Sequence, residues 1–107
     1  MFLPFLIVYF IYDTQLPQIV KAIKIILKGK VQGVGFRQFV REKAQHFAIH
    51  GYIANLENGD IEIVAEGKED EISAFIEMIR PGPPRAEVTE LVTEPIEHKG
   101  YKEFEMV

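Results

Sequence analysis

Residues 29–37 contain the residue types that bind phosphate groups in proteins. They read Gly29 Lys30 Val31 Gln32 Gly33 Val34 Gly35 Phe36 Arg37. Closely spaced glycines allow positive φ angles, so the backbone can turn several N–H groups toward one anion. A helix that begins near Phe36 would add the unpaired N–H groups of its first turn, and Arg37 offers a planar fork of donors that matches phosphate oxygens. We therefore predict a phosphate-binding loop made of Gln32, Gly33, Val34, Gly35, Phe36 and Arg37.

The spacing of this loop differs from the two best-known glycine-rich motifs. It lacks the Gly-Lys-Ser/Thr ending of a Walker loop, and it is not the GxGxxG of a dinucleotide-binding unit. The whole nine-residue string resembles the signature loop of the acylphosphatases, small enzymes that hydrolyse carboxyl-phosphate anhydrides. A second block resembles the other signature of that family: Gly51 Tyr52 Ile53 Ala54 Asn55, followed by Gly59, Asp60, Ile61 and Gly67.

The resemblance covers residues 21–107 and implies a function. It implies an acylphosphatase that splits small acyl phosphates into a carboxylate and inorganic phosphate without a cofactor or a metal ion. Arg37 and Asn55 would be the catalytic residues. A carboxylate is a good leaving group, so the enzyme needs mainly to neutralise the phosphoryl oxygens and to position the attacking water. Arg37 and the loop N–H groups suit the first task, and the amide of Asn55 suits the second.

Each of these residues also has an ordinary structural interpretation. At the start of a helix, Arg37 would otherwise be a solvated cation that the helix dipole mildly opposes, and a bound phosphate removes that objection. Asn55 alone could be a turn residue at the end of a strand, but the block around it favours catalysis. Gln32 either contacts the substrate or braces the loop. The motif contains no Ser, Thr or Cys, so water is expected to attack directly.

The composition restricts the remaining functions. A chain of 107 residues forms one domain, and the absence of Cys excludes disulfides and thiolate ligands. The net charge of −4 argues against a nucleic-acid-binding protein, although residues 1–50 hold seven Lys/Arg and only two acidic residues. His46, His50 and His98 lack the spacing of metal ligands. The cations near the loop either steer an anion or form a solvated basic face: Lys24, Lys28, Lys30, Arg37 and Arg41.

Hydrophobic periodicity predicts the elements that position these residues. We expect strands over 21–28, 49–54, 61–65, 88–93 and 101–106, and helices over 36–47 and 69–79. Asn58 and Gly59 form a hairpin signal, and the segment 81–84 ends the second helix. The order predicts an α+β, ferredoxin-like βαββαβ sandwich. It has an antiparallel sheet with two helices on one face and leaves the other face, with Ile26, open.

Residues 1–12 are almost wholly apolar and fall outside the resemblance. They are shorter than the roughly 20 residues that span a bilayer, and they lack the positive start of a signal peptide, so we expect a cytoplasmic protein. Their β-branched and aromatic content favours a strand or an ordered arm, followed by a linker over 13–18. This arm would cover either its own sheet or another subunit, and we favour a homo-oligomer. We thus divide the chain into an extension, 1–20, and an acylphosphatase-like domain, 21–107.

Two other classes of protein compete with the enzyme. Acylphosphatase-like domains also occur as modules within larger carbamoyl-transfer proteins that mature hydrogenases, but this chain has no zinc-finger Cys pattern. A ferredoxin-like RNA-binding domain would need exposed aromatic residues on its strands and a basic charge balance, and a metal carrier would need a CxxC motif. Neither feature is present in the sequence.

Overall fold

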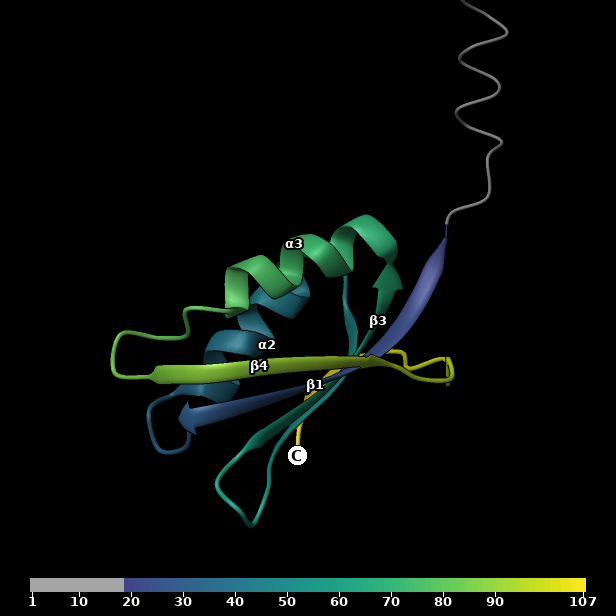
Figure 1. Cartoon of the computed structure of the whole chain (residues 1–107). Helices are drawn as coiled ribbons and strands as arrows, with labels where there is room; N and C mark the ends of the chain where they lie inside the picture. Colours follow the sequence, from purple (N-terminus) through teal and green to yellow (C-terminus); the bar gives the residue numbers. More distant parts are fainter. Residues whose placement is uncertain (1–18) are drawn as a thin grey trace, which may run out of the picture.

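The computed structural model describes residues 19–107. The elements in this part follow the predicted order of strands and helices (Figure 1). The strand β1 is longer at both ends than expected, and the final strand β5 is shorter. Their bounds are β1 Val20–Lys30, α2 Phe36–His46, β2 His50–Asn55, β3 Ile61–Lys68, α3 Glu69–Ile79, β4 Glu87–Pro95 and β5 Phe104–Met106.

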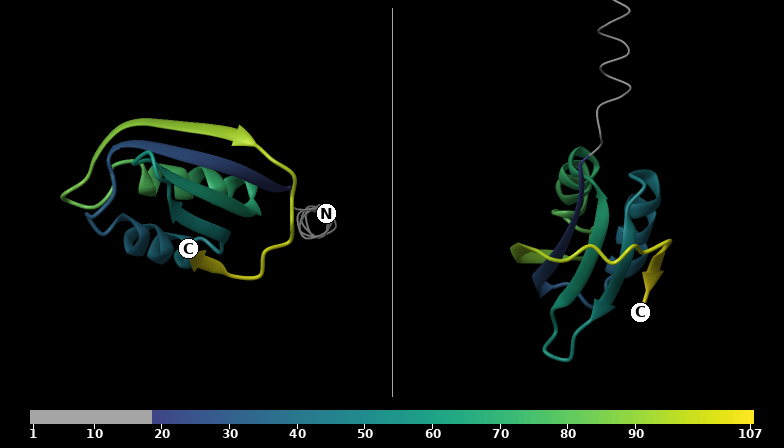
Figure 2. Two further views of the ribbon diagram at one scale, coloured as in Figure 1. Left: turned by 90° about the horizontal axis from the view of Figure 1, so that it is seen from below. Right: turned by 90° about the vertical axis from the view of Figure 1, so that its right-hand side faces the viewer.

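The five strands form one sheet in the order β4-β1-β3-β2-β5. The pairs β1–β3, β1–β4 and β2–β3 are antiparallel, as expected, but β5 runs parallel to β2, with Gly51 opposite Phe104. The prediction of a purely antiparallel sheet is therefore wrong at this edge. Figure 2 shows the reason: the chain leaves β4 at one edge, crosses the end of the sheet and returns at the other edge. A crossing of this kind brings β5 in alongside β2 in the same direction.

The segment that crosses the sheet is held by a buried carboxylate. Glu66 on β3 is only 3% exposed and accepts hydrogen bonds from the backbone N–H groups of Lys99, Gly100 and Tyr101. His98 Nε2 lies 3.5 Å from the same carboxylate. The N–H of Tyr101 is thus already bonded to a side chain, and pairing with β2 begins only at Glu103, whose carbonyl oxygen accepts from the N–H of Gly51 at 2.8 Å.

One hydrophobic core joins the sheet to both helices. Along the strands, alternate residues such as Ile25, Leu27, Ile53 and Ile63 are fully buried. The helix residues of this core lie at the predicted helical spacing: Phe36, Val40 and Ala44 from α2, and Ile72, Phe75 and Ile79 from α3. The α+β class with two helices and a five-stranded sheet is confirmed.

On the face of the sheet that points away from the core, side chains make contacts with one another that the sequence did not predict. Tyr52 Oη donates to the carboxylate of Glu62 at 2.8 Å, and the Tyr52 ring meets Tyr101 edge to face. Burial and the contact with Glu62 raise the pKa of Tyr52 to about 12. Ile26 is half-buried. This face therefore carries a polar network around its apolar side chains.

The predictions for residues 1–12 and 13–18 lie outside the described residues, and the domain boundary at residue 20 stays a prediction. Within residues 19–107, no helix is long and apolar enough to cross a membrane.

Candidate active site

The glycine loop connects β1 to α2 through two left-handed backbone positions. Gly33 has a φ angle of 73° and Gly35 one of 82°, and Gly35 is the N-cap of α2. A Cβ atom at either position would meet no heavy atom within 4 Å. Glycine is therefore required here by the backbone conformation and not by a lack of space. The predicted positive φ angles are present at both positions.

The side chain of Gln32 braces this loop against the turn between β2 and β3. Its Nε2 donates to the carbonyl oxygens of Leu56, at 2.8 Å, and of Asp60, at 2.9 Å. An amide nitrogen has two hydrogens, and these two bonds use both of them. Of the two alternatives for Gln32, the side chain is thus a brace, while a contact between its backbone N–H and phosphate stays a prediction.

Arg37 lies on the first turn of α2 and is half-buried. Its Nη1 donates to the backbone oxygen of Val107, 3.3 Å away, immediately after β5. A guanidinium has five N–H groups, so this contact orients the side chain and leaves donors for an anion.

A second arginine, which the sequence analysis missed, supports the loop from outside. Arg85, in the turn before β4, donates through Nη2 to the carbonyl oxygen of Gly33 at 3.1 Å. Nothing in the spacing around Arg85 predicts this contact, because it depends on how the turn after α3 folds over the loop.

A small cavity of about 160 Å³ opens at the start of α2. It brings together Arg37 and Asn55, the two residues predicted to be catalytic, from different elements. Asn55 ends β2 and lies on the same side of that strand as the buried Ile53, because strand side chains alternate. The residues that line the cavity are Val31, Gly33, Gly35, Phe36, Arg37, Gln38, Asn55 and Met106.

Gln32 and Val34 were also predicted to bind phosphate, but they are not among the residues that line the cavity. Val34 is buried in the core, and the Gln32 side chain points to the β2–β3 turn, so only their backbone groups remain available for an anion. Met106 and Gln38 line the cavity but were not predicted. Met106 was missed because its place depends on the unexpected direction of β5.

Three of the four lysines of β1, namely Lys21, Lys24 and Lys28, are paired with acidic residues. Lys28 Nζ lies 2.9 Å from the carboxylate of Asp60, and this hydrogen bond raises the pKa of Lys28. Lys24 lies 3.6 Å from Glu94 and 3.8 Å from Glu62. These pairs make Lys24 and Lys28 weak candidates for steering an anion, in contrast to the arginines of α2. Residues 19–107 contain no group of three or more His, Asp or Glu side chains that could hold a metal ion.

The fold and this cavity define a small α+β domain with an arginine and an asparagine beside a glycine loop. The family model for acylphosphatases matches residues 23–106. The chain therefore belongs to the acylphosphatase family, as the two sequence motifs indicated.

Known acylphosphatases resemble the chain over most of their length. An acylphosphatase of Deinococcus radiodurans is 42% identical over 79 residues, which cover 74% of this chain and 91% of the relative. The crystal structure of an acylphosphatase from Bacillus subtilis matches with a TM-score of 0.80 and 34% identity, over 83% of this chain and 99% of that one. A full-length HypF in a phosphate- and nucleotide-bound form matches with a TM-score of 0.81 and 37% identity. That match covers 87% of this chain but only 12% of HypF.

Proposed function

We propose that the protein is an acylphosphatase that hydrolyses small acyl phosphates to a carboxylate and inorganic phosphate. The observation that carries the proposal is that Arg37 and Asn55 line one cavity beside the glycine loop. The oxygen of a water molecule forms a bond to phosphorus, and the bond from phosphorus to the acyl oxygen breaks. Its electron pair leaves with the carboxylate, and the protons of the water remain on the phosphate and its surroundings.

The loop, Arg37 and Asn55 have separate tasks in this reaction. The backbone N–H groups of residues 32–36 and the guanidinium of Arg37 hold the phosphoryl oxygens, and their positive charge stabilises the transition state. The side-chain amide of Asn55 orients the attacking water. By comparison with oxyanion holes, loss of one donor of this kind lowers the rate on the order of 10²- to 10³-fold.

The same cavity excludes ordinary phosphate monoesters as good substrates. An alkoxide leaving group needs a proton from a general acid. Among residues 19–107, those that line the cavity include no His, Asp, Glu, Lys or Tyr. Only a leaving group that departs without a proton, such as a carboxylate, suits this site.

The proposal is tested by the release of phosphate from acetyl phosphate and from glycerol phosphate, without added metal. We expect rapid hydrolysis of acetyl phosphate, little hydrolysis of glycerol phosphate, and loss of activity in Arg37→Ala. Equal rates on the two substrates, or no rate on acetyl phosphate, would overturn the proposal. The second result would favour an accessory binding module, the alternative that the match to part of HypF supports.

We extend the proposal to the helix arrangement, the location and the assembly of the enzyme. The shared core of α2, α3 and the sheet supports a ferredoxin-like arrangement with both helices on one face. We also propose a cytoplasmic location, which cell fractionation tests.

We further propose that residues 1–12 mediate self-association, because they contain eight large apolar side chains, each worth roughly 1.5–3 kcal/mol when fully buried. Deletion of residues 1–18 should then lower the mass measured by light scattering, and an unchanged mass would exclude this role.

A further inference from the structure

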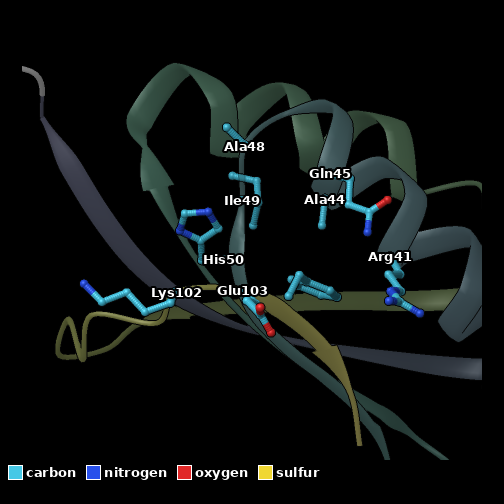
Figure 3. Close-up of a pocket in the computed structure, with 9 residues that line it drawn as sticks. Arg41, Ala44, Gln45, Ala48, Ile49, His50, Lys102 and Glu103 are labelled. Atoms are coloured by element: carbon cyan, nitrogen blue, oxygen red, sulfur yellow. The ribbon is translucent and has the colours of Figure 1, made fainter.

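A second cavity, of about 500 Å³, lies beside the later turns of α2. Figure 3 shows it between that helix and the chain that leads into β5. It is larger than the cavity at the glycine loop, and no step of the proposed hydrolysis uses it. The residues that line it are Arg41, Ala44, Gln45, Ala48, Ile49, His50, Lys102, Glu103 and Phe104.

The two cavities lie next to each other along α2 and β5. Arg37 lines the small cavity, and Arg41, one helical turn later, lines the large one. On the side of β5, Met106 lines the small cavity and Phe104 the large one. Arg41 lies where the two cavities meet, because its Nη1 is 4.0 Å from the sulfur of Met106, which lines the small cavity. We call the two cavities together the α2–β5 groove.

The large cavity combines an apolar floor with a mostly cationic rim. Ala44, Ile49 and Phe104 are buried beneath it. Figure 3 shows Arg41 and Lys102 at opposite ends of the cavity. These surroundings suit a short hydrocarbon chain that carries an anionic group.

The distance between Arg37 and Arg41 along α2 indicates that Arg41 would contact such an anionic group. Four helical residues rise about 6 Å, so this is the separation of Arg37 and Arg41 along the helix. From phosphorus to the last carbon of a four-carbon acyl group there are five bonds of about 1.5 Å each, which span roughly the same distance in a zigzag chain. A phosphoryl group held at Arg37 would therefore place the far end of a four-carbon acyl chain beside Arg41.

We propose that Arg41 is a specificity-determining residue that favours acyl phosphates whose acyl chain ends in a second carboxylate. The proposal rests on the proposed hydrolysis, because it uses the phosphoryl site at Arg37 as its fixed point. Arg41 provides the charge and a planar pair of donors for the distant carboxylate. Lys102 and Glu103 lie further along the groove and adjust its potential, with the carboxylate of Glu103 opposing a second anion.

The test compares two substrates of equal chain length, succinyl phosphate and butyryl phosphate. We expect the wild-type protein to show a higher kcat/KM for succinyl phosphate at low salt. Arg41→Gln should lower the ratio of the two kcat/KM values at least fivefold, mainly through the KM for succinyl phosphate. Glu103→Gln should raise that ratio. The matched control is Lys43→Gln, which removes one positive charge from the same helix but lies outside the groove and over the Phe39 ring.

The outcomes separate this inference from the proposed function. If butyryl phosphate is hydrolysed but Arg41→Gln leaves the ratio unchanged, the inference is wrong and the proposed hydrolysis stands. If Lys43→Gln lowers the ratio as much as Arg41→Gln, only the net charge matters, and the inference is again overturned. If neither substrate is hydrolysed, both proposals fail.

Discussion

The side-chain nitrogen Nε2 of Gln32 lies 2.8 Å from the carbonyl oxygen of Leu56, so one side chain fastens the glycine loop to the residue that follows Asn55. A second bond, to the carbonyl of Asp60, secures the far side of the same turn. The two residues that we assign to catalysis belong to elements that are joined by this brace. Their relative position should therefore depend on Gln32, which need not touch the substrate through its side chain.

Gln32→Ala should lower both stability and activity. Removal of the amide takes one donor from each of two partly buried carbonyl oxygens, and both oxygens keep a backbone N–H donor. The expected loss is therefore about 0.5–1.5 kcal/mol for each hydrogen bond. Gln32→Glu should be worse at neutral pH than in mild acid, because its carboxylate would face the same two carbonyls. Thermal unfolding and kcat/KM at pH 5 and pH 8 check this. An Ala variant with wild-type activity would show that the brace is dispensable.

Arg37→Ala should abolish hydrolysis and leave the fold intact, because Arg37 is half-buried and outside the core. Arg37→Lys should keep less than a tenth of the activity, since one ammonium cannot replace the two-pronged guanidinium. That threshold equals about 1.4 kcal/mol of transition-state stabilisation. The control is Arg85→Ala, which loses the contact to the Gly33 carbonyl and should reduce activity far less. A lysine variant above the threshold would contradict the assignment.

Asn55→Ala should lose turnover but keep its affinity for inorganic phosphate, because we assign this amide to the water and not to the anion. Isothermal titration of phosphate into the wild-type and variant proteins measures the affinity. If affinity falls together with kcat, then Asn55 instead helps to bind the anion or to shape the loop.

Hydrolysis should continue in the presence of EDTA, because Arg37 and backbone N–H groups provide the positive charge. The measurement is the rate of acetyl phosphate hydrolysis before and after chelation. Loss of activity that a divalent ion restores would overturn the mechanism, and so would a trapped phosphorylated enzyme.

Glu66→Gln should destabilise the protein at neutral pH but not in acid. Burial acts to raise the pKa of Glu66, but the N–H groups of residues 99–101 and the nearby His98 outweigh it, so the pKa is lowered from 4.5. When folding lowers the pKa of a carboxyl group, that group stabilises the fold at pH values above its pKa in the unfolded chain. This stabilisation is lost as the pH falls through its pKa in the folded protein. The variant and the wild type should therefore differ at pH 7 and converge only after the pH has fallen through the lowered pKa of Glu66.

Denaturant unfolding at several pH values measures this effect. The control Glu69→Gln removes an exposed carboxylate that pairs with Lys21, and it should change stability little at any pH. A pH-independent loss in the Glu66 variant would mean that its shape, and not its charge, holds residues 99–101.

Sequence reasoning located the features that depend on local pattern. The helix from Phe36, the turn at Asn58 and the two signature blocks are encoded in adjacent residues, so periodicity and motif spacing were enough to predict them. The direction of β5 was not predictable in this way, because alternation indicates which face a strand buries and not which neighbour it pairs with. A brace was one of the two roles predicted for Gln32, but its bonding partners and the contact of Arg85 were not predictable, since each joins segments that meet only after the sheet has formed.

The pairing of β5 with β2 also determines when the site can form. Gly51 pairs with Phe104, so the two strands meet only after a long loop has closed, and such distant contacts form slowly. On the ribosome, residues 20–95 emerge first and contain the four strands β1 to β4. Met106 and the Val107 contact of Arg37 join them later. In a refolding experiment, catalytic activity should accordingly return after most of the secondary structure, with the docking of the last strand as the step that completes the cavity.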